Sequence, residues 1–383
     1  MSNKQVFFAT CAPGVEPLLH VEAKALRLQR LERQVGGVRF EGTWIDAWRA
    51  NLWLRTAVRI LLRLERFRAL ESDDLFLGAS RIDWDRYLRP EGTLWVDAQT
   101  RESSLDHSRF IEQRVKDAIV DQMRERHGGR PTVSKDQPDL RVHVHIWRDR
   151  VTLSLDTSGD SLHKRGWRRT QGRAPLSETL AAAVVLASGW DRRSPLIDPF
   201  CGSGTLLVEG ALIADNVAPG LTRPRFGFES WPGHDAKGFA RCQDEARKAA
   251  KPARKLVLRG SDIDPQRIEE AQENLDAAGL AERVQLEVAD AREFAPRPGW
   301  NACVVTNPPY GERLGRAENL GGLYQDFGNA LRERCGGYRV GLLSGNPELA
   351  QQLGLAEVTR TPFLNGSIEC ELLTAELPLN QPV

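Results

Sequence analysis

The chain has 383 residues, of which 41% are hydrophobic and 27% are charged. This composition supports two or three globular domains and excludes a disordered chain. No apolar run reaches the ~18 residues of a membrane-spanning helix, and the first residues lack the basic start and apolar core of a signal peptide. We therefore expect a cytoplasmic protein with no membrane partner.

The net charge of +1 hides an uneven distribution of charged residues. Residues 1–173 carry 31 Lys and Arg against 24 Asp and Glu, whereas the remainder carries 22 against 28. A basic, Arg-rich half indicates a polyanionic partner. None of the six cysteines lies in a C-x-x-C pair, so we expect buried thiols, no disulfide framework and no metal site.

The first half of the chain alternates irregularly between predicted strands and helices, which is typical of an α+β fold. Strands are expected at residues 5–10, 31–35, 38–41, 57–67, 93–100, 142–146 and 151–156. Helices are expected at residues 15–28 and 44–52, from residue 72 onward, and at 108–127. Val142, Val144 and Ile146 alternate with polar residues, so the strand that they form should have one buried face.

Residues 158–173 are predicted to join the two halves, because they contain three glycines and a basic run. Two interpretations stay open. The segment is either a solvated linker or a nucleic-acid contact, in which an aromatic ring stacks on a base while neighbouring cations bind phosphates. The candidate RNA-binding residues in it are Lys164, Arg165, Trp167, Arg168 and Arg169.

The second half has the rhythm of a doubly wound, mostly parallel α/β sheet, since short apolar strands alternate with helices. The strands are expected at 196–200, 256–262, 284–288, 302–306 and 338–344. The helices are expected at 177–188, 205–215, 265–279 and 320–334. Residues 217–255 are interpreted as an insertion after the first crossover helix.

The first chemically informative segment is LIDPFCGSGT at residues 196–205. It is predicted to form a strand, a tight turn at Gly202 and Gly204, and a helix that starts at Thr205. Glycines in such a turn let the backbone approach a ligand closely, and the helix N-terminus offers free N–H groups. The segment is not G-x-G-x-x-G, because Leu207 stands at the third glycine position, and it is not a P-loop. A turn without a ligand is the alternative.

The second segment is GSDIDP at residues 260–265, which follows the next predicted strand. An acidic side chain there can accept hydrogen bonds from two ribose hydroxyls, and Asp262 is the candidate. Asp264 is instead expected to cap the helix that begins at Pro265 and ends near Gly279. Asp290, after the third strand, is positioned to accept a hydrogen bond from an adenine amino group.

The third segment is NPPYGER at residues 307–313, directly after an apolar strand. Two prolines fix the backbone and cannot donate hydrogen bonds, so their carbonyls are left as acceptors. The side-chain oxygen of Asn307 and the carbonyl of Pro308 can both accept from one NH₂ group, and Tyr310 can stack on a planar ring. We interpret this arrangement as a device that holds an exocyclic amine of a base; a proline-rich turn without chemistry is the alternative.

Taken in this order, DPFCGSGT, GSDIDP, ADA and NPPY resemble the class I S-adenosyl-L-methionine (AdoMet) methyltransferases that modify amino groups of bases. The longer strings HKRGWR from His163, APLSETLA from Ala174 and NPPYGER from Asn307 resemble the THUMP-domain RNA methyltransferases. Among these, the sequence is most similar to the guanine-N2 methyltransferases of bacterial 23S rRNA, the RlmL type. The resemblance is specific from about residue 163 to the end, and over the first 160 residues it rests on order, size and basic content.

This resemblance implies the fold class and the domains. The fold is α/β: a Rossmann-like class I methyltransferase domain at 174–383, preceded by an α+β ferredoxin-like and THUMP RNA-binding region. We expect a ferredoxin-like segment at 1–60, a THUMP-like domain at 61–157 and a linker at 158–173. Some family members carry a second methyltransferase after this unit, and because this chain ends at Val383 we expect that second activity to be absent.

The resemblance further implies AdoMet as the cofactor, RNA as the partner and methylation of a guanine N2 in 23S rRNA as the activity. Segment 175–181 would close the cofactor pocket. The residues implied in cofactor binding are Asp198, Pro199, Gly202, Gly204, Thr205, Asp262, Ile263, Asp290 and Asn307. The residues implied in catalysis are Asn307, Pro308 and Tyr310.

Three other functions stay open at this point. N-P-P-Y also serves adenine-N6 methylation of RNA or DNA, and methylation of a guanine N2 in tRNA is a further alternative. A non-catalytic RNA-binding assembly factor is the third alternative. The intact cofactor motifs argue against the assembly factor, and a basic N-terminal half without a DNA-reading motif favours RNA over DNA.

Overall fold

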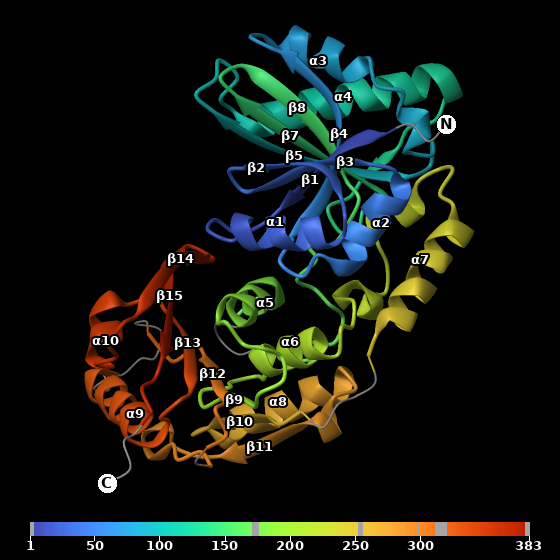
Figure 1. Cartoon of the computed structure of the whole chain (residues 1–383). Coiled ribbons are helices and arrows are strands. Elements are labelled where there is room, and N and C mark those ends of the chain that lie inside the picture. The colour runs from blue at the N-terminus through green and yellow to red at the C-terminus, as the bar shows by residue number, and fades with distance from the viewer. Residues whose placement is uncertain (1–3, 171–175, 252–255, 298, 311–319, 380–383) are drawn as a thin grey trace. The chain divides into compact units, whose positions relative to one another are not determined.

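The computed structural model describes residues 4–170, 176–251, 256–297, 299–310 and 320–379 (Figure 1). The chain divides into two compact units. The first consists of Met1–Thr10, Glu22–Leu162 and Arg223–Asp244, and the second of Cys11–Val21, His163–Thr222 and Glu245–Val383.

The first unit contains an eight-stranded sheet with the order β2-β3-β1-β4-β8-β7-β5-β6. The predicted hairpin around Gly36 is confirmed, and this glycine has the positive φ that its turn requires. The strands are β1 (Gln5–Thr10), β2 (Gln29–Gln34), β3 (Gly37–Gly42), β4 (Arg59–Arg68), β5 (Thr93–Arg101), β6 (Thr132–Val133), β7 (Leu140–Trp147) and β8 (Arg150–Asp156).

The helices of this unit cover one face of its sheet. Leu62, Leu155 and Val142 stand opposite one another on β4, β8 and β7 and are buried, as the predicted alternation requires. Helices α2 (Trp44–Trp53) and α3 (Ser72–Ser80) pack against β4, and α4 (Ser108–His127) packs against β5. Helix α4 has the bounds predicted from the sequence, because Gly128 adopts the left-handed conformation that ends it.

The insertion contributes to both units. Its first part, with the short helix η2 (Pro219–Thr222), belongs to the second unit. Residues 223–244 belong to the first unit and include most of helix α7 (Ala236–Ala249). Phe228 and Phe239 contact each other edge-on and pack against Trp48 of α2. This aromatic cluster explains why the start of the insertion is rich in large apolar residues.

The solvated-linker interpretation is wrong for most of residues 158–170, and residues 171–173 of the predicted linker lie outside the described residues. Ser158, Leu162 and Trp167 are buried. The guanidinium of Arg223 donates hydrogen bonds to the backbone carbonyls of Ser161 at 2.8 Å and Asp160 at 2.7 Å. The chain here is therefore held by side chains that come from the insertion, more than 60 residues later in the sequence.

The second unit contains a seven-stranded sheet with the order β11-β10-β9-β12-β13-β15-β14. The first five strands in this order are parallel, whereas β15 pairs antiparallel with β13 and with β14. The strands are β9 (Leu196–Asp198), β10 (Leu258–Asp262), β11 (Val284–Val288), β12 (Cys303–Thr306), β13 (Arg339–Ser344), β14 (Thr359–Asn365) and β15 (Ile368–Glu376).

Helices cover both faces of this second sheet. Val340 and Leu342 on β13 belong to the apolar cluster around helix α9, whereas the intervening Gly341 lies against Ser188 at the end of helix α5. The predicted doubly wound, mostly parallel sheet is therefore confirmed. The helices of this unit are α5 (Glu178–Ala187), α6 (Thr205–Ala214), α8 (Pro265–Ala277), α9 (Leu320–Arg334) and α10 (Pro347–Gln352) (Figure 1).

Within the part of the chain that the structure describes, no helix combines the length and the apolar character needed to cross a membrane. All six cysteines are buried, as the sequence predicted.

Candidate active site

The candidate site lies where the parallel strands of the second sheet end. Strand β9 stands between β10 and β12, so the chain leaves β9 toward one side of the sheet and later returns to the other side. The crevice at such a switch point is the usual ligand site of an open α/β sheet. The three motifs singled out from the sequence follow β9, β10 and β12, and the fold thus brings them to one edge.

The turn after β9 is built from two left-handed glycines. Gly202 and Gly204 have φ values of 49° and 79°, and Gly204 is the N-cap of α6. The Cys201 N–H donates to the carbonyl of Ser261 at 2.9 Å, which ties the turn to β10. Apart from Gly202 itself and its two neighbours in the chain, no described atom lies within 4 Å of the position that a Cβ on Gly202 would take. The backbone of this turn is therefore open to a ligand.

Asp262, at the end of β10, faces the glycine turn. One carboxylate oxygen accepts a hydrogen bond from the Gly202 N–H at 3.0 Å, and the other accepts from the Asp264 N–H at 3.1 Å. Burial raises the pKa of Asp262 despite these hydrogen bonds. The carboxylate is held in a fixed position and retains lone pairs for further donors such as ribose hydroxyls.

Two apolar side chains are exposed beside this carboxylate. Ile263 is 62% exposed and Val288, at the end of β11, is 53% exposed. The Ala289 N–H donates to the Asp262 carbonyl at 3.1 Å, which keeps the two strand ends together. Ile263 and Val288 form an apolar edge on which a flat ring can pack.

Asp264 and Asp290 both act as helix caps in this structure. Asp264 accepts from the Gln266 N–H and caps α8, with Pro265 as the first helical residue, as predicted. Asp290 accepts from the Arg292 N–H, and both of its carboxylate oxygens also accept from the Arg292 guanidinium. The pairing with Arg292 lowers the pKa of Asp290. An adenine amino group would have to share this carboxylate with Arg292.

Asp198 links the ends of β9 and β12. Its side chain is 1% exposed and accepts a hydrogen bond from the Thr306 hydroxyl at 2.6 Å and from the Phe200 N–H at 3.2 Å. Burial, opposed only in part by these hydrogen bonds, raises its pKa to about 7. A carboxyl of this kind becomes fully ionised near neutral pH only where a cation approaches it.

The segment after β12 presents an unused acceptor. The side-chain oxygen of Asn307 is buried and has no hydrogen-bond partner among the described residues. Pro308 beside it is buried, and the carbonyl of Pro309 accepts from the Tyr324 hydroxyl at 3.2 Å. Buried polar atoms are normally paired, so an unpaired one at a ligand-binding edge indicates a donor supplied by a ligand.

Tyr310 is held at both ends of its side chain. Its hydroxyl accepts a hydrogen bond from the Asn365 amide at 2.9 Å, and its ring lies so close to Gly345 that a Cβ there would clash with it. Burial raises the pKa of Tyr310. The ring therefore has a fixed position after the Asn307 segment, as a stacking platform would require.

Two buried side chains brace the glycine turn: Arg168, which was predicted to contact RNA, and Asn274, which the sequence did not single out. Arg168 forms an ion pair with Glu178 at 2.8 Å and donates to the Thr205 hydroxyl at 3.0 Å. Asn274 of α8 donates to the Ser203 carbonyl at 3.1 Å and accepts from the Arg169 N–H at 2.8 Å. These contacts hold the turn between α5 and α8.

The brace corrects part of the RNA-binding prediction. Arg165 and Trp167 are each 1% exposed, and Arg165 forms a buried ion pair with Glu209. Together with Arg168, they point into the protein and not toward a phosphate in this conformation. Lys164 and Arg169 have exposed side chains and stay candidates for RNA contact.

The remaining predicted residues are placed as follows. Pro199 and Thr205 are buried at the turn. Ala174, Pro175 and residues 311–313 lie outside the described residues. Within the described ranges, no group of three or more His, Cys, Asp or Glu could hold a metal ion.

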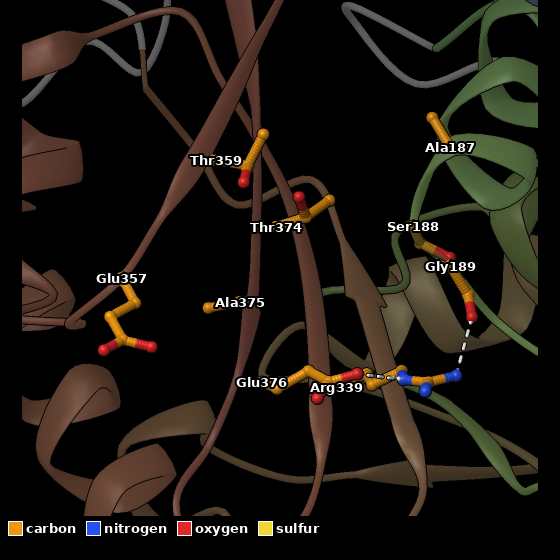
Figure 2. Close-up of a pocket in the computed structure, with 9 residues that line it drawn as sticks. All are labelled: Ala187, Ser188, Gly189, Arg339, Glu357, Thr359, Thr374, Ala375 and Glu376. Carbon is orange, nitrogen blue, oxygen red and sulfur yellow. Dashed lines mark hydrogen bonds and ion pairs between the residues drawn. The ribbon is translucent and has the colours of Figure 1, made fainter.

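A separate polar cavity of about 510 Å³ lies in the same unit (Figure 2). It is lined by Ser188 and Gly189 at the end of α5 and by Arg339, whose guanidinium contacts Glu376 at 2.9 Å and the Gly189 carbonyl at 3.0 Å. Arg339 is the first residue of β13, so this cavity lies at the sheet edge opposite to the strand ends that carry the three motifs. It is therefore distinct from the candidate active site.

Comparison with family models agrees with this geometry. Residues 165–374 match the model described as RMKL-like, methyltransferase domain; residues 71–156 match the THUMP domain, and residues 6–61 match the RlmL ferredoxin-like domain. The doubly wound sheet, with the three motifs at the carboxyl ends of its parallel strands, therefore forms a methyltransferase domain. More particularly, the chain belongs to the family of RMKL-like methyltransferase domains.

Known relatives cover the chain at high identity. The ribosomal RNA large subunit methyltransferase K/L of Methylococcus capsulatus is 44% identical over 379 residues, which are 97% of this chain and 51% of the relative. The chain spans about half the length of the curated relatives it matches.

Several solved structures match almost the whole chain, two of them at 30% identity or more with bound SAH or a stated base specificity in their descriptions. One is a candidate methyltransferase in complex with SAH, with a TM-score of 0.89, 30% identity and full coverage of both chains. The other, from Listeria monocytogenes, is described as a predicted N6-adenine-specific DNA methylase and has a TM-score of 0.88 and 32% identity, with 98% of this chain and 97% of that chain covered.

The buried carboxyl of Asp198 predicts a pH dependence of stability. The folded chain holds a proton on Asp198 that the unfolded chain, with an ordinary pKa of 3.8, releases, so stability falls as the pH rises from about 4 to about 7. Asp198→Asn removes this contribution. The variant should lose less unfolding free energy between about pH 5 and about pH 8 than the unmodified chain.

Urea unfolding at the two pH values measures this difference. Some pH dependence should persist in the variant, because burial also raises the pKa of Asp262. An Asp198→Asn variant that loses as much stability as the unmodified chain would contradict the assignment of the raised pKa to Asp198.

Proposed function

We propose that this chain transfers a methyl group from AdoMet to the exocyclic N2 amine of a guanine in 23S rRNA. The observation that carries the proposal is the buried side-chain oxygen of Asn307, which has no hydrogen-bond partner among the described residues. It lies beside the carbonyl of Pro308, at the edge where the AdoMet-binding motifs meet. Together these two acceptors can hold both hydrogens of one NH₂ group.

The residues at the sheet edge fit AdoMet. The backbone of the glycine turn, which is open at Gly202, suits the methionine part, and the carboxylate of Asp262 suits the ribose hydroxyls. Ile263, with Val288, supplies an apolar edge for the adenine ring, whose amino group would reach Asp290. AdoMet supplies a positively charged sulfonium with an electrophilic methyl group, and that positive charge favours the ionised form of Asp198.

The acceptor side of the site orients the target amine. An exocyclic amine of a base is flat because its lone pair is delocalised into the ring. Acceptors from Asn307 and Pro308 favour a pyramidal nitrogen whose lone pair points at the methyl group, while Tyr310 stacks on the base. A base in a helix must first leave its stack to reach this edge. The extra proton leaves to solvent after transfer, so the residues need supply no general base.

The choice of ribosomal RNA rests on the relatives. Those at 44% and 43% identity are named ribosomal RNA large subunit methyltransferases K/L, and residues 71–156 match the THUMP domain. The proposed division is a ferredoxin-like segment at 1–60, a THUMP-like RNA-binding domain at 61–157 and a methyltransferase domain from 174. We propose Lys164 and Arg169 as additional RNA contacts, segment 175–181 as the cover of the donor pocket, and the cytoplasm as the location.

Adenine N6 is the alternative acceptor, because it is also an exocyclic amine and one structural neighbour is described as an N6-adenine-specific DNA methylase. Methylation of guanine N2 and methylation of adenine N6 give different modified nucleosides. The chain should be incubated with labelled AdoMet and unmodified 23S rRNA, tRNA or DNA, followed by nucleoside mass spectrometry. We expect N2-methylguanosine from 23S rRNA. N6-methyladenosine as the only product would replace the proposal by the alternative.

Asp262 tests the donor site separately. Asp262→Ala removes two hydrogen bonds from ribose to a charged acceptor, each of which contributes about 1.5–3 kcal/mol. AdoMet affinity, measured by calorimetry, should fall at least ~10-fold. The matched control Asp264→Ala removes the same charge two residues away and should lose helix stability with little loss of affinity. Equal affinities of a folded Asp262→Ala variant and the unmodified chain would reject the ribose assignment.

A further inference from the structure

One face of the sheet in the first unit carries mostly polar side chains. Along β4, β5, β7 and β8, the residues that alternate with the buried ones point away from α2, α3 and α4, and most of them are polar. At one end of this face six residues form what we call the open-face patch: Arg66, Arg68, Arg101, His145, Trp147 and Arg150.

Strand register brings these residues together. One row crosses four neighbouring strands and consists of Arg101 on β5, Trp147 on β7, Arg150 on β8 and Arg68 on β4. The next row contains His145 and Arg66, which flank Thr152 of β8. Residues that stand opposite one another share a face and are about 5 Å apart between strands. The patch is therefore a property of the fold.

Three of the four arginines of the patch have no acidic partner among the described residues, whereas the fourth, Arg101, lies 3.6 Å from Glu102. Arg66, Arg68 and Arg150 are exposed and form no ion pair with any described residue. The acidic Asp97 on the same face lies two rows further along and pairs with Arg141 at 3.0 Å. Three free guanidinium groups at strand spacing favour an elongated polyanion.

Trp147 adds a second kind of contact. Trp147 is 47% exposed although its side chain is large and hydrophobic, and the guanidinium of Arg148 lies 4.8 Å from the ring centroid. The cation fixes the ring plane, and Arg148 is itself held by Glu102 at 2.9 Å. A fixed, exposed indole between arginines is suited to stacking on an unpaired base.

We propose that the open-face patch binds single-stranded RNA, with Trp147 stacked on one base and Arg66, Arg68 and Arg150 on neighbouring phosphates. The choice of RNA as the polyanion rests on the proposed function. The stacking contact requires a base that is not already stacked in a helix, so the patch should prefer single strands over duplexes.

The test compares two triple variants of the full chain that remove the same charge. Arg66→Gln/Arg68→Gln/Arg150→Gln alters the patch. Arg81→Gln/Arg89→Gln/Arg241→Gln alters three exposed arginines elsewhere in the same unit: at the end of α3, after the short helix η1 (Trp84–Arg86) and on α7. Binding of a short fluorescein-labelled RNA is measured by anisotropy at several salt concentrations.

For the patch variant we expect affinity to fall at least ~10-fold and the slope of log affinity against log salt to decrease by about 2, because each lost single-strand phosphate contact contributes about 0.7. The control variant should keep the slope of the unmodified chain. Trp147→Ala should lower the affinity for the single strand about 10-fold, remove the preference over a duplex of the same sequence, and be rescued by Trp147→Phe.

Equal losses in the two triple variants, or an unchanged strand preference in Trp147→Ala, would overturn the patch assignment. Methyl transfer is followed separately in the same proteins. If the patch variants keep both their RNA affinity and their methyl transfer to RNA, the assignment of RNA binding to the patch is wrong and the proposed function stands. Absence of transfer by the unmodified chain would instead overturn the proposed function.

Discussion

The buried hydrogen bond between Asp198 and Thr306 is the contact on which the site depends. It joins the ends of β9 and β12 at the point where the strand order reverses, and both partners are almost fully buried. A carboxyl desolvated in this way is costly unless it is protonated or faces a cation. Asp198 therefore fixes the position of the glycine turn relative to the Asn307 segment. Its carboxyl also favours binding of a positively charged ligand at this edge.

The rest of the second unit supports this edge from behind. Arg168 and Asn274 fix the glycine turn with buried polar contacts, so the open backbone at Gly202 is rigid although it carries no side chains. Tyr310 is fixed in the same manner by Asn365 and Gly345. Ligand-facing groups that are held by a second layer of contacts need little reorganisation when the substrate binds. Because the methyl group of AdoMet is already electrophilic, such positioning of the reacting groups can accelerate its transfer.

Much of this was predictable from the sequence, because glycine turns, N-caps and apolar periodicity are local signals. Asp264 capping α8 and Gly128 ending α4 are examples. Nonlocal contacts were not predictable. The composition of the basic run at 164–169 favours solvent or RNA as its surroundings, but Glu209 and Glu178 pair with two of its arginines inside the protein. The sequence pattern does not indicate the antiparallel strands β14 and β15, since Pro362 interrupts the pattern of an edge strand.

The central claim is that the Asn307 oxygen holds the target amine, and single-turnover methyl transfer to 23S rRNA by Asn307→Ala tests it most directly. Stacking and phosphate contacts are unaffected by this change, so RNA affinity should be retained. The rate of the chemical step should fall ~10²–10³-fold, because the lost acceptor acts mainly as the amine becomes pyramidal. Asn329→Ala on α9, outside the site, is the control and should keep the full rate. A full rate in Asn307→Ala would contradict the account.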